Sequence, residues 1–182
     1  MKVFRSTEFE VESGKDFMIG DQIEIGKYTA TCQEASDEGA VFLLDQYIDR
    51  AYPMNKKMTN EGGYEASDLR KMLQSDEILD IFAPVRDRMK PFENGDLVRI
   101  PFVEELFGED DYYELSDKKQ WPLMKDRRNR IASREGDEYE WGWLQNKVKS
   151  SGTLFAYVAY FGNSAYGGAS GSRGVRPAIW LA

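Results

Sequence analysis

The chain has 182 residues, of which 41% are hydrophobic and 13% aromatic, so it can form one domain with a core and global disorder is excluded. It has no histidine and one cysteine, Cys32, which excludes histidine-dependent triads and dyads, histidine or cysteine metal centres and an intramolecular disulfide. The net charge of −8 disfavours nonspecific binding to nucleic acid or anionic membranes, although it is compatible with a local basic patch.

The N-terminal residues carry charges where a signal peptide needs an apolar run. The longest apolar run, 40–44, is the size of a strand and far too short to span a membrane. We therefore expect a protein without a signal peptide or membrane insertion, located in the reducing cytoplasm or carried in a phage particle.

The N-terminal segment, 1–36, is expected to be extended. Within it, residues 22–31 alternate between apolar and polar side chains, which indicates a strand with one buried and one solvent-facing side. The turn residues 37–39 and the apolar run 40–44 then predict an antiparallel hairpin.

Helical signals follow. Ser67 is a candidate N-cap for a helix over 69–73, and the apolar residues of 78–82 predict a second helix that Pro84 ends. A turn at 94–96 precedes an expected strand at 97–100.

A further helix is expected over 102–107, because Pro101 stands at its start and Gly108 just past its end. Residues 109–140 are dominated by charges, and we interpret them as a long surface insertion. Residues 121–124 and Ile131 are expected to attach it to the body.

The C-terminal part is again typical of strands. We expect strands at 141–144, 154–161 and 175–181, with a loop rich in Gly, Ser, Asn and Tyr at 162–174. Pro177 predicts that the last strand lies at a sheet edge or contains a bulge. Strands at both ends with helices between them predict a single α+β domain, 1–182, with 109–140 as a charged insertion.

Several motifs resemble a family of bacterial and phage domains of unknown function. The C-terminal residues 141–144 (Trp-Gly-Trp-Leu), 156–158 (Ala-Tyr-Val) and 174–178 (Gly-Val-Arg-Pro-Ala) follow that family's pattern. Upstream, 64–73 is similar to its Ser-x-Leu-Arg-x-x-Leu helix and 97–107 to its strand and acidic helix. The resemblance covers the chain from about Ile23 onward, and 174–178 is its most specific part.

The same ending is similar to that of C-type-lectin-like folds, which include formylglycine-generating enzymes and diversified receptor-binding proteins of phages. The resemblance implies antiparallel sheets with two or three short helices, a terminal strand paired with the N-terminal region, and ligand contacts from the preceding loop. Residues 145–147 (Gln-Asn-Lys) depart from the family's usual Arg-Ser. The oxidase branch of the fold needs a cysteine pair, which Cys32 alone does not provide.

The loop 162–173 is the main candidate for a binding surface. Tyrosine offers a large contact area at low entropic cost, and Ser, Gly and Asn adapt their hydrogen bonds to a ligand. The alternative is a flexible loop whose glycines serve turns only. The candidate ligand-binding residues are Trp143, Tyr157, Tyr160, Asn163, Ser164, Tyr166, Ser170, Ser172 and Arg173.

Other aromatic and charged residues have structural interpretations. Trp141, Trp143 and Tyr160 could form a platform for sugars or bases, but aromatic residues at alternate strand positions favour a core for the two tryptophans. Arg176 lies in an apolar strand, so we expect it to be buried with a carboxylate or carbonyl partner. Cys32 is expected to be buried and inert.

No catalytic or metal-binding residue is predicted. Residues 168–174 have the wrong spacing for a dinucleotide loop, and no helix follows them. The acidic residues of 109–114 lack calcium-loop spacing, which favours a solvated loop. Glu104 and Glu105 are adjacent on a helix and point about 100° apart, so they do not indicate a catalytic pair. Ser116 and Lys119 match Ser-x-x-Lys without its companion motifs.

These observations predict a non-enzymatic ligand-recognition domain, phage- or prophage-related, that needs no cofactor. Its partner would be a protein or a glycan, and not nucleic acid. Two alternatives remain open: a structural or assembly protein of a phage particle, and a carboxylate-dependent hydrolase.

Overall fold

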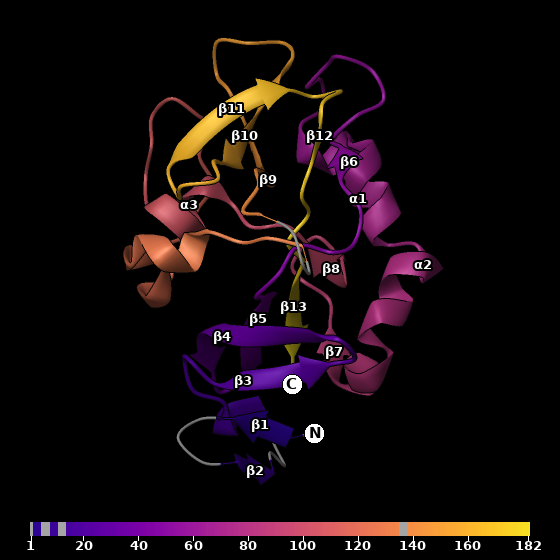
Figure 1. Ribbon diagram of the computed structural model, residues 1–182, viewed down its shortest axis with the longest axis vertical. Coiled ribbons are helices and arrows are strands. Elements are labelled where there is room, and N and C mark those ends of the chain that lie inside the picture. Colours follow the sequence, from indigo (N-terminus) through magenta and orange to yellow (C-terminus); the bar gives the residue numbers. More distant parts are fainter. Residues whose placement is uncertain (1, 5–7, 11–13, 135–137) are drawn as a thin grey trace. The chain divides into compact units, whose positions relative to one another are not determined.

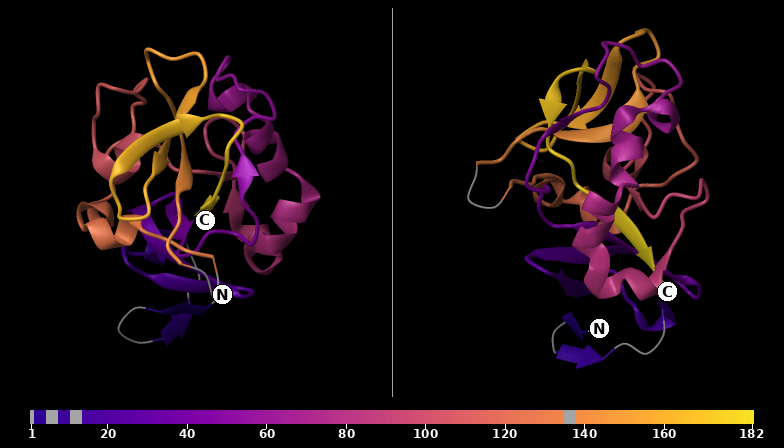
Figure 2. Two further views of the ribbon diagram at one scale, coloured as in Figure 1. Left: turned by 45° about the horizontal axis from the view of Figure 1, so that its top comes forward. Right: turned by 90° about the vertical axis from the view of Figure 1, so that its right-hand side faces the viewer.

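The computed structural model describes residues 2–4, 8–10, 14–134 and 138–182 (Figures 1 and 2). The chain forms two compact units. Unit 1 comprises Met1–Asp45, Leu73–Arg99 and Pro177–Ala182, and unit 2 comprises Gln46–Met72 and Ile100–Arg176. Parts of the extended segment expected at 1–36 and of the insertion expected at 109–140 lie outside the described residues. That the whole chain acts as one domain stays a prediction.

Unit 1 is built on one antiparallel sheet with strand order β2-β1-β3-β4-β5-β13-β7, in which β8 also pairs with β13. Its strands are β1 (Lys2–Phe4), β2 (Glu8–Glu10), β3 (Gln22–Ile25), β4 (Tyr28–Ser36), β5 (Gly39–Leu44), β7 (Met89–Lys90), β8 (Val98–Arg99) and β13 (Ala178–Leu181).

The hairpin predicted from the alternation is confirmed. In β3 the side chains of Ile23 and Ile25 are buried, whereas Gln22 and Glu24 are exposed. β4 and β5 pair across the turn at 37–38, and every residue of β5 is buried. Cys32 lies in β4 and is fully buried, as expected.

Helical turns complete unit 1. The short 3-10 helix η1 (Gly14–Asp16) precedes β3, and α2 (Asp76–Leu79) continues directly into the 3-10 helix η3 (Asp80–Arg88). The prediction that Pro84 ends the second helix is wrong, because Pro84 lies inside η3. A proline removes one amide donor, and successive 3-10 turns accommodate that loss better than a continuous α-helix.

The C-terminal strand β13 lies inside the sheet. It pairs with β5 on one side and with β7 and β8 on the other, so the edge position predicted from Pro177 is wrong. Pro177 precedes the strand, and its carbonyl accepts a hydrogen bond from the amide of Leu44 at 3.0 Å. Its missing N–H therefore costs the sheet no hydrogen bond.

Unit 2 contains two small antiparallel sheets and short helices. One sheet has the order β11-β10-β9 and the other pairs β12 with β6. Its elements are β6 (Tyr52–Pro53), η2 (Tyr64–Ala66), α1 (Asp68–Leu73, whose last residue belongs to unit 1), α3 (Val103–Phe107), η4 (Pro122–Lys125), η5 (Arg127–Arg130), β9 (Gly142–Lys147), β10 (Leu154–Val158), β11 (Ser164–Gly168) and β12 (Ser172–Arg173).

Two predicted helix boundaries, Ser67 and Gly108, are confirmed in this unit, whereas α3 begins at Val103 and not at Phe102. The hydroxyl of Ser67 accepts a hydrogen bond from the amide of Arg70 at 3.0 Å at the start of α1. Gly108, with a φ of 79°, ends α3. In the insertion, Trp121 and Met124 are buried as expected and hold η4 against unit 2. Arg176 is buried and donates to the carbonyl of Asn129 at 2.9 Å, which confirms its structural role.

The predicted loop at 162–174 is instead largely a pair of strands. β11 pairs along its length with β10, and β12 pairs with β6, so only short turns remain. The mostly antiparallel sheets with few short helices confirm the α+β class.

Candidate ligand-binding site

The predicted site residues lie around the sheet formed by β9, β10 and β11. Trp143 is opposite Tyr157 in the β9–β10 register, and Ala156 is opposite Tyr166 in the β10–β11 register. Residues that face each other across antiparallel strands share one side of the sheet, and neighbours along a strand lie on opposite sides. Trp143 and Tyr157 therefore share one face, and Tyr166 lies on the other.

Arg173 on β12 lies among three aromatic rings. The carbon of its guanidinium is 4.4 Å from the ring centre of Tyr157, 4.5 Å from that of Trp143 and 5.9 Å from that of Trp141. We call these three rings the aromatic box. Their electron-rich faces attract the delocalised charge of arginine. Burial lowers the pKa of Arg173 from its ordinary value.

Glycines give the guanidinium its space. A Cβ atom at Gly167 would overlap the Nη2 atom of Arg173, and one at Gly171 would lie 2.6 Å from Nη1. The Nε atom of Arg173 is buried, and no hydrogen-bond acceptor for it is present among the described residues. The aromatic box thus holds a cation that no acidic side chain in the described part of the chain neutralises.

Trp143 forms the closed side of the box. Its side chain is only 1% exposed, and its indole N–H donates to the carbonyl of Tyr52 on β6 at 2.7 Å. The predicted burial of Trp143 is confirmed. A ligand at this site would therefore contact Arg173 and Tyr157 and would not touch the buried ring of Trp143.

Trp141 differs, and its predicted place in the core is wrong. Its side chain is 46% exposed. β9 begins at Gly142, so Trp141 lies just outside the strand, whose first five residues are all buried. Its ring stacks on that of Tyr157, with centres 5.8 Å apart and planes 29° apart. Trp141 is therefore a rigidly held aromatic surface open to solvent.

A cavity of about 410 Å³ opens beside the box. We call it the aromatic cavity. Its lining residues are Glu138, Tyr139, Glu140, Trp141, Tyr160, Ser172 and Arg173. Three of them, Tyr160, Ser172 and Arg173, belong to the predicted set. Tyr160 is 52% exposed and packs edge-to-face on Phe161, with ring centres 4.9 Å apart.

The acidic residues of this cavity are differently placed. Glu140 accepts a hydrogen bond from Nε of Arg134 at 2.7 Å, so its carboxylate is already bound by a neighbour. Glu138 is exposed. The cavity therefore combines aromatic surfaces, the hydroxyl groups of one serine and two tyrosines, one carboxylate open to solvent and the edge of a guanidinium, a mixture typical of a site that orients a small ligand.

The opposite face of the sheet carries a second tyrosine pair. Tyr166 is 45% exposed, and its ring stacks on that of Tyr112 with centres 5.0 Å apart. The hydroxyl of Tyr113 donates to the carbonyl of Ala165 at 3.1 Å. Burial raises the pKa of Tyr113 to about 12, against a smaller opposite effect of a hydrogen bond with Ser164. Tyr166 and Ser164 thus belong to this face.

The remaining two predicted residues lie in turns. The carbonyl of Asn163 accepts the amide of Ala159 at 2.9 Å, which closes the turn between β10 and β11. The hydroxyl of Ser170 contacts the sulfur of Met58 at 3.7 Å. Neither residue lines the aromatic cavity. Whether any of the nine residues contacts a ligand stays a prediction.

The sequence interpretation missed four lining residues: Glu138, Tyr139, Glu140 and Trp141. They were assigned to the insertion or to the core. The alternate aromatic residues 139, 141 and 143 were the available signal, because side chains two apart in an extended segment point the same way. What the spacing did not indicate is where the strand begins, and that point decides which rings are exposed.

Other candidate groups have structural partners. Glu104 is buried, and its carboxylate accepts hydrogen bonds from the amide of Ser116 and from Nδ2 of Asn146, the latter at 2.8 Å. Glu105 is also buried and accepts the amide of Phe102 at 2.9 Å. Both carboxylates thus fix the position of α3. In the described residues, no group of three or more acidic or cysteine side chains is placed to hold a metal ion.

A second cavity of about 450 Å³ lies next to this network. Two ion pairs border it. Glu114 and Lys147 both line the cavity and lie 3.3 Å apart, and the lining residue Glu65 pairs with Arg70 at 3.1 Å. Its polar groups are therefore largely bound to each other, and it has no exposed aromatic cluster like that of the aromatic cavity.

Comparisons of the chain with protein-family models, with curated proteins and with solved structures found no match. Among the described residues, no helix combines the length and apolar character needed to cross a bilayer.

Proposed function

We propose that this protein is a non-enzymatic recognition domain that binds a glycan in the aromatic cavity. The observation that carries the proposal is the combination of exposed Trp141 and Tyr160 with Arg173, which the aromatic box holds in place. Sugar rings have flat apolar faces and polar edges, so they match aromatic surfaces next to a few fixed hydrogen-bonding groups.

Rigidity supports a binding role. Trp141 is stacked on Tyr157, and Arg173 is enclosed by rings and by two glycines. A site whose side chains are already fixed loses little conformational entropy when a ligand arrives. Exposing several apolar aromatic rings to water around one cavity is also unfavourable. Their presence is best explained by a ligand or a partner that covers them.

We further propose that the α+β arrangement is C-type-lectin-like. The support is the sequence 174–178 (Gly-Val-Arg-Pro-Ala) together with the pairing of β13 with β5, which matches the terminal strand expected from the resemblance. The proposed binding residues on β11 and β12 directly precede that terminal strand.

The test uses an array of neutral and acidic glycans, followed by calorimetry on the best ligand. Replacing Trp141 and Tyr160 with alanine should weaken binding by at least about tenfold, the usual effect of removing aromatic anchors. Tyr166→Ala is the matched control, since Tyr166 is equally exposed but lies on the opposite face. The melting temperature should be nearly unchanged in the control.

Two results would contradict the proposal. One is a protein that binds no glycan on the array. The other is an equal loss of affinity in Tyr166→Ala, which would place the ligand on the opposite face. A stable oligomer that dissociates when Trp141 and Tyr160 are replaced would instead favour the assembly role.

A further inference from the structure

Positive charge is concentrated in one part of this acidic protein. Between residues 118 and 134 there are seven Lys and Arg and one acidic residue, Asp126, whereas the whole chain has a net charge of −8. The side chains of Lys125, Arg127 and Arg128 are exposed. We call residues 125–130 the basic segment.

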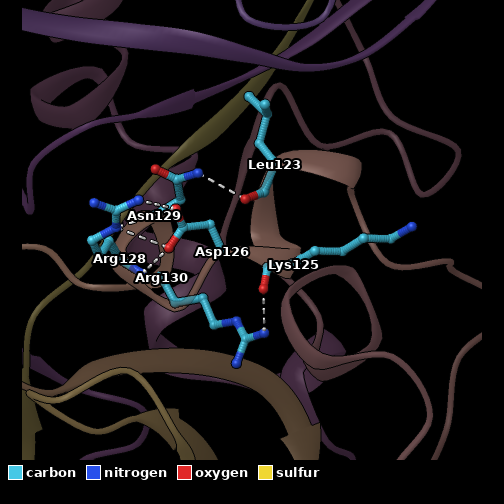
Figure 3. A network of polar contacts seen from close by, with 6 residues as sticks. All are labelled: Leu123, Lys125, Asp126, Arg128, Asn129 and Arg130. Carbon is cyan, nitrogen blue, oxygen red and sulfur yellow. Dashed lines mark hydrogen bonds and ion pairs between the residues drawn. The ribbon is translucent and has the colours of Figure 1, made fainter.

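Asp126 does not neutralise this segment. Its carboxylate is bound by Arg128, with Nη2 at 2.7 Å and Nε at 3.2 Å, and it also accepts the amide of Arg128 at 3.0 Å (Figure 3). These hydrogen bonds lower the pKa of Asp126 to about 2. One arginine therefore offsets Asp126, and the charges of Lys125, Arg127 and Arg130 remain.

Hydrogen bonds to carbonyl groups fix the shape of the basic segment. Asn129 donates from Nδ2 to Leu123 at 2.7 Å, and Arg130 donates from Nε to Met124 at 2.6 Å. Figure 3 shows the Asn129 contact and the weaker one from Arg130 to Lys125, which together fold η4 and η5 against each other. Lys125 and Arg127 are therefore presented on an ordered backbone.

The basic segment lies beside the aromatic cavity. A Cβ atom at Gly162 would lie 2.7 Å from Cγ of Arg127, and Gly162 comes two residues after the cavity-lining Tyr160. The orange turns of η4 and η5 lie next to the start of β11 in Figures 1 and 2. At the other end, Arg134 binds the cavity-lining Glu140.

Lys125 and Arg127 have no ion-pair partner within the described ranges, and the same holds for Arg173 in the cavity. Cations without counter-charges thus occur both in the cavity and beside it. We infer that the glycan bound in the aromatic cavity carries carboxylate or sulfate groups, and that Lys125 and Arg127 bind them. This inference rests on the proposed function and specifies its ligand class.

A single-stranded nucleic acid would also offer rings and negative charge. The carboxylates of Glu138 and Glu140 line the same cavity, where they accept hydrogen bonds from the dense hydroxyl groups of a sugar, of which a nucleic acid strand offers far fewer. The observations therefore favour an acidic glycan.

The experiment compares three probes: polygalacturonate as an acidic glycan, dextran as a neutral one, and a thymidine oligonucleotide. The test variant is Lys125→Gln with Arg127→Gln, which keeps both side chains long and polar. The control is Lys56→Gln with Lys57→Gln, because these exposed lysines also lie in unit 2 and their loss gives the same net charge.

The wild-type protein should bind polygalacturonate more tightly than dextran, and added salt should reduce the difference. The test variant should lose about fivefold in affinity for polygalacturonate and none for dextran, as expected for two exposed charge contacts. The control variant should bind like the wild type. Circular dichroism of both variants should match that of the wild-type protein.

The inference is overturned if both variants lose affinity equally, since net charge alone would then explain the effect. It is also overturned if dextran binds as well as polygalacturonate, or if the oligonucleotide binds best. Replacing Trp141 and Tyr160 separates the two proposals. If that replacement leaves polygalacturonate binding intact while the test variant loses it, the cavity proposal fails and the charge contact stands.

Discussion

The two faces of the β9–β10–β11 sheet use the same residue types in opposite ways. On one face, Trp143 and Tyr157 surround the guanidinium of Arg173, and Trp143 is sealed from solvent. On the other face, Tyr166 and Tyr112 stack against each other while both stay exposed. The Tyr, Gly and Ser composition therefore identifies the region that displays aromatic rings, and the two-residue period of the strands decides on which face of the sheet each ring lies.

The largest effect that would test this comparison is expected at the closed side of the box. Trp143→Ala should lower the free energy of unfolding by about 3–5 kcal/mol, because it leaves a cavity and removes the partner of the Tyr52 carbonyl. Trp141→Ala, on the exposed side, should cost only about 1 kcal/mol. Urea denaturation of both variants measures the difference, and equal losses would mean that the two rings are equivalent.

A smaller loss is expected when the space for Arg173 is filled. Gly167→Ala should reduce stability by about 1–2 kcal/mol, because the added methyl group displaces the guanidinium from the aromatic box. Gly152→Ala is the control, since nothing lies within 4 Å of a Cβ at that position. A shift in the near-ultraviolet circular dichroism of Gly167→Ala alone would show that the rings have moved.

On the opposite face the expected coupling is weaker still. A double-mutant cycle of Tyr112→Ala and Tyr166→Ala should give an interaction free energy of about 0.5–1 kcal/mol, the range for an exposed aromatic pair. Thermal unfolding of the two single variants and the double variant supplies the three values. A coupling as large as the loss in Trp143→Ala would remove the contrast between the faces.

The last effect is a dependence of stability on pH at Tyr113, which appears only at alkaline pH. Its pKa is raised from the ordinary value of about 10 to about 12, so the folded state favours the neutral phenol. The resulting stabilisation is complete below about pH 10 and is lost as the pH rises through about 12. Tyr113→Phe should remove this pH dependence. Ultraviolet titration of the wild type and the variant measures the pKa of Tyr113 by difference. A difference that corresponds to one tyrosine ionising near pH 10 would contradict this prediction.

Much of unit 1 was predictable from local pattern. The alternation of Ile23 and Ile25 with polar residues determines which side of β3 is buried, and the apolar run 40–44 predicts β5. In unit 2, Ser67 and Gly108 mark helix ends, because their roles depend on nearby backbone groups alone. The interpretation failed at Pro84 and Pro177. Pro84 lies inside the 3-10 helix η3, and Pro177 precedes β13, which pairs within the sheet, so in both places the effect of the missing N–H depended on structure that the local sequence does not show.

The candidate site was predictable only as a region. Residues 162–173 were predicted to form a binding loop, but most of them belong to the strands β11 and β12. Tyr160 and Ser172 line the cavity with Arg173, whereas Tyr166 and Ser164 face the other way. Trp141 and Glu138 join the cavity from a segment whose alternate aromatic residues, 139, 141 and 143, were the available signal, but this spacing does not show where β9 begins.

The sequence by itself determined the inventory: no histidine, one cysteine, many aromatic residues and a concentration of basic residues within an acidic chain. These facts limit the available chemistry whatever the fold. Only the tertiary structure decided that Arg173 enters a box of rings, that Trp141 stays exposed and that the basic segment lies beside the cavity. The reason is physical, because composition and period are properties of one segment, whereas a site is made of distances between segments that are far apart in the chain.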